Sequence, residues 1–117
     1  MKARAVITYK HYFDEFFRAQ QPKVRDKIIK ILDIIEQVDR IPSNYLKYME
    51  GTNGLFEVRV QFGNNIFRIF CFFDGNRFVI LLTGFQKKTQ KTPPEEIVRA
   101  VRLMEEYYEE KRKETGK

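Results

Sequence analysis

The spacing of apolar residues predicts two consecutive helices near the N-terminus. Phe13, Phe16 and Phe17 fall on one side of a helix, which predicts a short amphipathic helix over Tyr12–Ala19. Pro22 favours the start of a second helix, because proline suits the first helical position. From there apolar residues recur at intervals of three and four, at Val24, Ile28, Ile31, Leu32, Ile35 and Val38. Both helices should therefore bury one face in a common core.

Strand patterns dominate the middle of the chain and also occur once near the N-terminus. The candidate strands are Ala5–Tyr9, Leu55–Phe62, Asn65–Phe73 and Phe78–Phe85. Gly-Asn at positions 63–64 and Asp-Gly-Asn at 74–76 are turn signals, so the last three strands should form an antiparallel meander. Residues 39–54 are polar and contain proline, glycine and asparagine, which predicts a loop with room for one turn of helix.

Two arginines stand out in the predicted meander. Apolar residues of Leu55–Phe62 alternate with Glu57, Arg59 and Gln61, so Arg59 should point away from the core. The next strand is apolar on both faces except at Arg68, as is typical of a central strand. A partly buried arginine generally needs an anionic partner. Two interpretations of Arg68 stay open: a structural ion pair with Glu57, or a site for a phosphate group.

A basic segment follows the last predicted strand. It carries Lys87, Lys88 and Lys91 and leads to Thr92-Pro93-Pro94-Glu95, the pattern of a capping box with proline at the first helical position. A helix should run from there to about Lys113. Because the free N–H groups at a helix start favour anions, the lysines can form a phosphate grip, although a solvated basic turn is the simpler interpretation.

Composition limits the class of protein. The chain has 117 residues, of which 43% are hydrophobic, enough for one compact core. We therefore expect a single α+β domain over residues 1–117: an N-terminal helical pair packed on a twisted, mainly antiparallel β-sheet, with a C-terminal helix. The net charge of +6 and the pI near 9.5 point to an acidic partner such as nucleic acid.

Several classes of function lack the residues they need. The only cysteine, Cys71, lies in an apolar run and should be buried, and the one histidine, His11, has the neighbours of a surface residue. The sequence contains no glycine-rich nucleotide loop, Cys/His array or Ser/His/Asp set, so we expect no metal or cofactor. No apolar run is long enough for a signal peptide or a membrane span, which favours a cytoplasmic protein without a membrane partner.

RNA cleavage is compatible with these residues. The 2′-hydroxyl of RNA can attack the adjacent phosphate without a metal, provided that cations stabilise the charge of the transition state. The planar guanidinium of Arg59 or Arg68 suits this task, and a lysine crowded by other cations can act as base or acid. On the polar side of the second helix, Lys23, Lys27 and Lys30 can bind RNA without sequence preference.

The same residues resemble a known family. The segments that carry the resemblance are Leu55–Val60, Ile66–Phe70, Phe73–Gly75 and, most specifically, Leu82–Pro93 with its lysine-rich run. They are similar to the RelE/ParE toxin superfamily, in particular to its HigB-like, phage Gp49-like branch. The resemblance covers residues 55–102 well, and the N-terminal helices only by pattern.

The resemblance implies a toxin of a type II toxin–antitoxin system that cleaves mRNA on the ribosome. It also implies a cognate antitoxin, in this branch one with a helix-turn-helix domain. Arg59 and Arg68 match the basic strand positions that face the scissile phosphate, and the basic positions after the last strand match Lys87, Lys88 and Lys91. We accordingly expect Arg59, Arg68 and Lys88 to be catalytic, and RNA to be bound by Lys87, Lys91, Lys23, Lys27 and Lys30.

Two departures from the family pattern affect the mechanism. Glu57 stands where RelE has a lysine, and neither Tyr107 nor Tyr108 is placed like the C-terminal tyrosine of RelE. The general base is therefore unassigned. The alternatives are a non-enzymatic, ParE-like toxin that inhibits a protein such as DNA gyrase, and a module that binds RNA without cleaving it.

Overall fold

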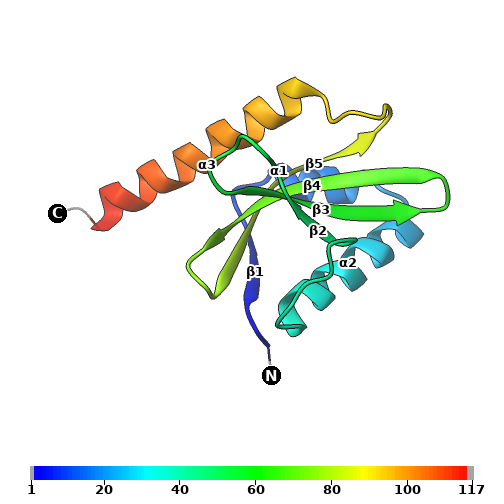
Figure 1. Cartoon of the computed structure of the whole chain (residues 1–117), viewed down its shortest axis with the longest axis horizontal. Helices are drawn as coiled ribbons and strands as arrows, with labels where there is room; N and C mark the ends of the chain where they lie inside the picture. The colour runs from blue at the N-terminus through cyan, green and yellow to red at the C-terminus, as the bar shows by residue number, and fades with distance from the viewer. Residues whose placement is uncertain (1, 116–117) are drawn as a thin grey trace.

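A five-stranded mixed sheet with helices on both faces forms the protein (Figure 1). The computed structural model describes residues 2–115. The strands lie in the order β1-β5-β4-β3-β2. In chain order the elements are β1 (Ala5–Thr8), α1 (Tyr12–Arg18), α2 (Pro22–Gln37), β2 (Leu46–Tyr48), β3 (Leu55–Phe62), β4 (Asn65–Asp74), β5 (Phe78–Lys87) and α3 (Pro94–Thr115).

The predicted meander is present. β3, β4 and β5 pair antiparallel, with Val58 opposite Ile69 and Phe72 opposite Ile80. β1 joins the sheet parallel to β5, so that Val6 lies opposite Val79. The expected α+β fold, with a helical pair on a mainly antiparallel sheet, is confirmed.

One predicted loop contains a strand. Leu46–Tyr48 forms β2, which pairs antiparallel with residues 56–58 of β3 and extends the sheet by one edge strand. The prediction of an irregular connection was wrong here, because three residues are too few to show an alternation. Their strand conformation depends on the ladder of hydrogen bonds that β3 offers.

The two faces of the sheet are covered differently. α1 and α2 pack on one face through a core of buried residues that includes Phe13, Val24, Ile28, Ile31, Ile35, Val58, Val60, Phe67, Ile69, Cys71, Val79 and Leu81. α3 packs on the other face, against Tyr9, Leu55, Phe70, Phe72, Ile80 and Leu82. The C-terminal end of α3 extends past the edge of the sheet in Figure 1.

A β-bulge in β5 reverses the direction of the side chains that follow it. Ile69 lies opposite Gly84 but Cys71 lies opposite Leu81, so β5 uses three residues where β4 uses two. Before this point Leu81 faces the α1/α2 core; after it Phe85 faces the α3 side. A Cβ on Gly84 would lie 2.5 Å from the Phe16 ring, so only glycine allows α1 to pack this closely on β5.

The C-terminal helix begins one residue later than the capping-box pattern predicts. α3 starts at Pro94, and the N–H groups of Glu96 and Ile97 both donate to the carbonyl of Pro93. The Thr92 side chain makes no hydrogen bond to these N–H groups. The helix start is therefore closed by the Pro93 backbone, because the second proline fits a first helical position as well as the first one does.

Candidate functional site

A cluster of charged residues continues the sheet face on which α3 packs. β3 contributes Glu57 and Arg59, β4 contributes Arg68, and β5 ends with Lys87. The register brings them together, because Arg59 lies directly opposite Arg68, and Lys47 of β2 lies opposite Glu57. Four strands therefore place four cations and one carboxylate on a single face, and we call these five residues the charged cluster.

Glu57 and Arg68 are the buried centre of the cluster. Their residues are only 5% and 6% exposed. The Oε2 atom of Glu57 lies 3.6 Å from the Nε atoms of both Arg59 and Arg68, and Arg68 Nη1 donates a hydrogen bond of 3.0 Å to the Phe67 carbonyl. The ion-pair interpretation of Arg68 is thus present in the structure. It leaves the more exposed Arg59 as the guanidinium nearest to solvent.

The buried pair is not fully satisfied by hydrogen bonds. A distance of 3.6 Å allows an ion pair but is too long for a hydrogen bond. Within residues 2–115, Glu57 Oε1 and Arg68 Nε find no hydrogen-bond partner. Burial lowers the pKa of Arg68, while the charge of Glu57 opposes this shift. Since buried polar atoms are normally paired, these two atoms mark the Glu57–Arg68 pair as an incompletely satisfied polar group at the centre of the cluster.

Lys87 is the lysine that joins the cluster. It is half-buried at the end of β5, and burial is the main cause that lowers the pKa of its ammonium group. The positive charges of Arg68, Arg59 and Lys47 lower this pKa further, whereas Glu57 raises it. A lysine with these neighbours releases its proton more readily than a solvated one.

The other lysines of the basic segment lie outside the cluster. Lys88 and Lys91 are exposed in the irregular stretch between β5 and α3, where the Thr89 hydroxyl donates to the Lys91 carbonyl. Lys88 shares no described hydrogen bond, ion pair or pocket lining with Arg59 or Arg68, and its catalytic role stays a prediction. The neighbouring Lys87 feels the charges of both arginines, because β5 continues two residues beyond its predicted end.

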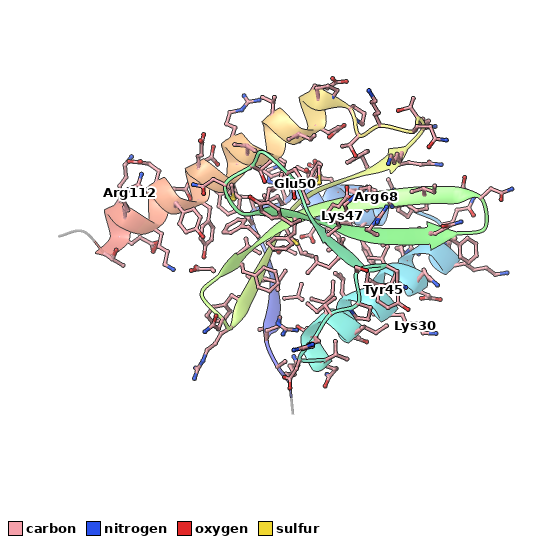
Figure 2. All side chains as sticks on the ribbon, viewed as in Figure 1. Lys30, Tyr45, Lys47, Glu50, Arg68 and Arg112 are labelled. Atoms are coloured by element: carbon pink, nitrogen blue, oxygen red, sulfur yellow. The ribbon has the colours of Figure 1, made fainter. Side chains whose placement is uncertain are left out.

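A hollow adjoins the cluster at the exposed edge of β3. It has a volume of about 400 Å³ and is lined by Lys27, Ile31, Asn44, Tyr45, Arg59, Val60, Gln61 and Arg68. Lys27 thus comes close to the arginines, whereas Lys23 and Lys30 are exposed on α2. In Figure 2, Lys30 projects from α2, while Lys47 and Arg68 lie together on the sheet.

Lys47 and Tyr45 were missed by sequence reasoning. Both flank or belong to β2, whose short strand has no visible pattern, so nothing placed them beside β3. The only available signal was the density of aromatic residues in a segment that otherwise has the composition of a loop.

The remaining features concern metals and membranes. No group of three or more His, Cys, Asp or Glu side chains within the described chain is arranged to hold a metal ion. None of the helices in residues 2–115 has the length and apolarity of a membrane span.

Comparison with known proteins gives a family and a fold. The model of the family described as "Phage derived protein Gp49-like" matches residues 15–105. The crystal structure of the archaeal RelE–RelB complex from Pyrococcus horikoshii OT3 contains a chain that superimposes with a TM-score of 0.54 at 16% identity. The match covers 77% of this chain and 99% of that chain. No curated protein sequence matches.

Proposed function

Because the chain belongs to the Gp49-like family and has the fold of the RelE/ParE superfamily, we propose that it is the toxin of a type II toxin–antitoxin system. Its activity is ribosome-dependent cleavage of mRNA. The family and the fold support a toxin, and the charged cluster supports the nuclease.

The observation that best supports nuclease activity is that four cations lie around one carboxylate. Lys47, Arg59, Arg68 and Lys87 surround Glu57, so three positive charges stay uncompensated. A phosphate diester is the anion that fits such a site, because it accepts several hydrogen bonds and gains charge during the reaction. Preorganised cations stabilise this developing charge better than water does.

Three residues of the charged cluster have distinct tasks in this proposal. Arg59, with 33% of its side chain exposed, contacts the scissile phosphate. Arg68 lies deeper and adds charge behind it, held in place by Glu57 and by the Phe67 carbonyl. Lys87, whose pKa is lowered, exchanges a proton with the attacking or the leaving oxygen.

The chemistry uses the RNA as its own nucleophile. The 2′-hydroxyl oxygen attacks the adjacent phosphorus, the bond from phosphorus to the 5′-oxygen breaks, and the products are a 2′,3′-cyclic phosphate and a 5′-hydroxyl end. The guanidinium groups stabilise the five-coordinate phosphorus through planar pairs of donors.

The exposed lysines suggest RNA partners, and the similar solved structure suggests a protein partner. Lys88 and Lys91 lie on the exposed segment next to the cluster, where they contact the mRNA backbone, and Lys23 and Lys30 on α2 contact ribosomal RNA. The archaeal RelE with the similar fold was solved in complex with RelB. By analogy, this chain pairs with a cognate antitoxin, which in the Gp49-like branch carries a helix-turn-helix domain.

The test is to map mRNA 5′ ends in a translating extract with three proteins: wild type, Lys87→Met and Lys88→Met. The two variants lose the same charge at neighbouring positions, but only Lys87 lies in the charged cluster. We expect Lys87→Met to lower the cleavage rate at least a hundredfold, which is the lower range for loss of an acid–base group. Lys88→Met should lower it far less.

Two controls complete this experiment. The same mRNA without ribosomes should stay intact, and thermal unfolding should show that both variants are folded. Growth arrest by the wild type with intact mRNA would contradict the nuclease and support a ParE-like inhibitor of a protein target. Equal losses for the two lysine variants would contradict the role of Lys87.

A further inference from the structure

The two lysines of the charged cluster have different surroundings. Lys47 is exposed, whereas Lys87 is half-buried. Arg68 lies opposite Phe85, so Lys87, two residues further along β5, stands on the same face of the sheet and diagonally across from Arg68. Diagonal neighbours on paired strands are within reach of each other when their side chains are long. The side chains of Lys87 and Arg68 are therefore neighbours.

Lys87 also lacks a carboxylate partner of its own. Lys10 and Lys111 each form an ion pair with a carboxylate, at N–O distances of 2.7 and 2.6 Å. Across residues 2–115, the Lys87 ammonium group forms no such pair, and the carboxylate of the cluster, Glu57, pairs with the two arginines. Burial and the nearby cations lower the pKa of Lys87, so a larger share of this amine is neutral than of a solvated lysine. A neutral amine can act as a nucleophile.

Groups that bind an anion lie beside this amine. The Arg59 side chain is 33% exposed and presents a planar set of donors to solvent, with Arg68 behind it. Both guanidinium charges act on Lys87. A phosphate group held by the two arginines therefore lies next to a lysine that can attack an electrophile.

The electrophile that fits this arrangement has its phosphate directly on the reactive carbon. In an acyl phosphate, the carbonyl carbon is bonded to a phosphate oxygen, so binding the phosphate also positions the carbonyl group. Negative charge grows on that phosphate as the bond from carbon to oxygen breaks. Preorganised cations stabilise such developing charge. An uncharged acyl donor gains neither effect.

We propose that Lys87 is a modification site, acylated on Nζ by acyl phosphates whose phosphate group binds Arg59 and Arg68. The Nζ electron pair attacks the carbonyl carbon, an N–C bond forms, and the bond from this carbon to the phosphate oxygen breaks. Inorganic phosphate leaves with the electron pair of the broken bond, and the amine proton passes to phosphate or water. The products are an amide at Lys87 and inorganic phosphate.

Acylation would switch the candidate site off. The amide nitrogen has no positive charge and does not exchange a proton near neutral pH, so Lys87 loses both properties that cleavage needs from it. The inference rests on the phosphate-binding part of the proposed function and does not require that the protein cleaves RNA.

Mass spectrometry of the isolated protein tests the modification with two donors of the same acetyl group. Acetyl phosphate carries the phosphate, and N-acetoxysuccinimide is uncharged. The measured quantity is the ratio of the acetylation rates at Lys87 and at Lys88, which is the exposed neighbour in the chain and serves as an internal control. We expect this ratio to be at least about fivefold higher with acetyl phosphate, because the cations assist only that donor.

Arg59→Gln should lower the ratio for acetyl phosphate at least about threefold, because the donor loses its exposed guanidinium. Arg77→Gln removes the same charge from the exposed β4–β5 turn and should keep the wild-type ratio. Inorganic phosphate should slow the reaction at Lys87, whereas chloride at equal ionic strength should not. Equal ratios for the two donors in the wild type, or an unchanged ratio in Arg59→Gln, would overturn the proposal.

An assay of mRNA cleavage separates this inference from the nuclease. If the protein cleaves mRNA, treatment with acetyl phosphate should lower the cleavage rate in proportion to the acetylated fraction of Lys87. Undiminished cleavage by protein acetylated at Lys87 would contradict the switch. If the protein cleaves nothing but the two donors differ as expected, the modification site stands and only the nuclease fails. Cleavage together with equal donor ratios would remove the modification site alone.

Discussion

Glu57 organises the candidate site at the scale of single residues. Its carboxylate lies between Arg59 and Arg68, at 3.6 Å from each Nε, and it is almost fully buried. Two guanidinium groups this close would repel each other, and the carboxylate removes that repulsion. Glu57 therefore lets the two guanidinium groups stay next to each other on adjacent strands.

Removing one partner of the Glu57–Arg68 ion pair should lower the free energy of unfolding far more than replacing both partners with apolar side chains. Arg68→Ala leaves the Glu57 carboxylate buried with Arg59 as its remaining partner, so we expect a loss of about 3 kcal/mol in the free energy of unfolding. The double variant Glu57→Leu/Arg68→Met fills similar volume without charge and should recover most of it. Urea unfolding measures both. A double variant as unstable as the single one would refute the charge argument.

At the scale of elements, hydrogen bonds to two carboxylates, Glu106 and Asp74, hold α3 on the sheet. The Tyr9 hydroxyl and the Lys10 ammonium both donate to Glu106 at 2.7 Å. Tyr107, the next residue of α3, and Lys111, one turn beyond it, both donate to Asp74 at the end of β4. These contacts fix the rotation of the helix, and its Leu103 and Met104 side chains then face the core.

The Asp74 contact predicts how stability depends on acid. Its bonds to Lys111 and Tyr107 lower the pKa of Asp74 below the usual value of 3.8. The folded form therefore binds its proton less readily than the unfolded chain, so the stabilisation is present above pH 3.8 and is lost as pH falls below it. Asp74→Asn should flatten this part of the curve of unfolding free energy against pH.

The pKa of Tyr107 shifts in the opposite direction, upward, and this affects stability at alkaline pH. Burial and the Asp74 contact raise its pKa from 10.0 to about 12, so stability should fall between pH 10 and 12, and less so in Tyr107→Phe. Unfolding in urea followed by circular dichroism measures both limbs. Asp33→Asn, at an exposed position of α2, is the control that should leave the acid limb unchanged. An Asp74→Asn curve identical to wild type would contradict the proposed fastening.

At the scale of the whole molecule, the excess of positive charge favours RNA before any specific contact forms. The net charge is +6, and lysines are exposed both on α2 and beside the charged cluster. Contacts between lysine and phosphate release counterions, so affinity falls with salt in proportion to their number. The ribosome should therefore be held by a set of separate, salt-sensitive contacts.

Lys23→Gln/Lys30→Gln tests this. The plot of log affinity for ribosomes against log salt concentration should become shallower by about 1–2, because each lost phosphate contact contributes roughly 0.7–0.9. The matched control Arg77→Gln/Lys113→Gln removes the same charge from the β4–β5 turn and the end of α3, away from α2 in Figure 1. Equal changes in slope for both pairs would show a general charge effect instead of a binding face on α2.

Much of the architecture follows from local pattern. The periodicity of α2 and the alternation in β3 gave these elements nearly their observed bounds, because each pattern extends over two or more turns or pairs of residues. The same alternation placed Arg59 outside the core. The three residues of β2 carry no such pattern, and they form a strand only because the edge of β3 lies beside them.

The site itself was decided by the tertiary structure. In an unbroken strand, Lys87 would share the direction of Val79 and Leu81 and face the α1/α2 core, since side chains alternate with a period of two. The bulge after Leu81 adds one residue, reverses this direction, and brings Lys87 to the face of Arg68. The sequence determined which cations exist and which strands carry them; pairing between strands determined which of them meet.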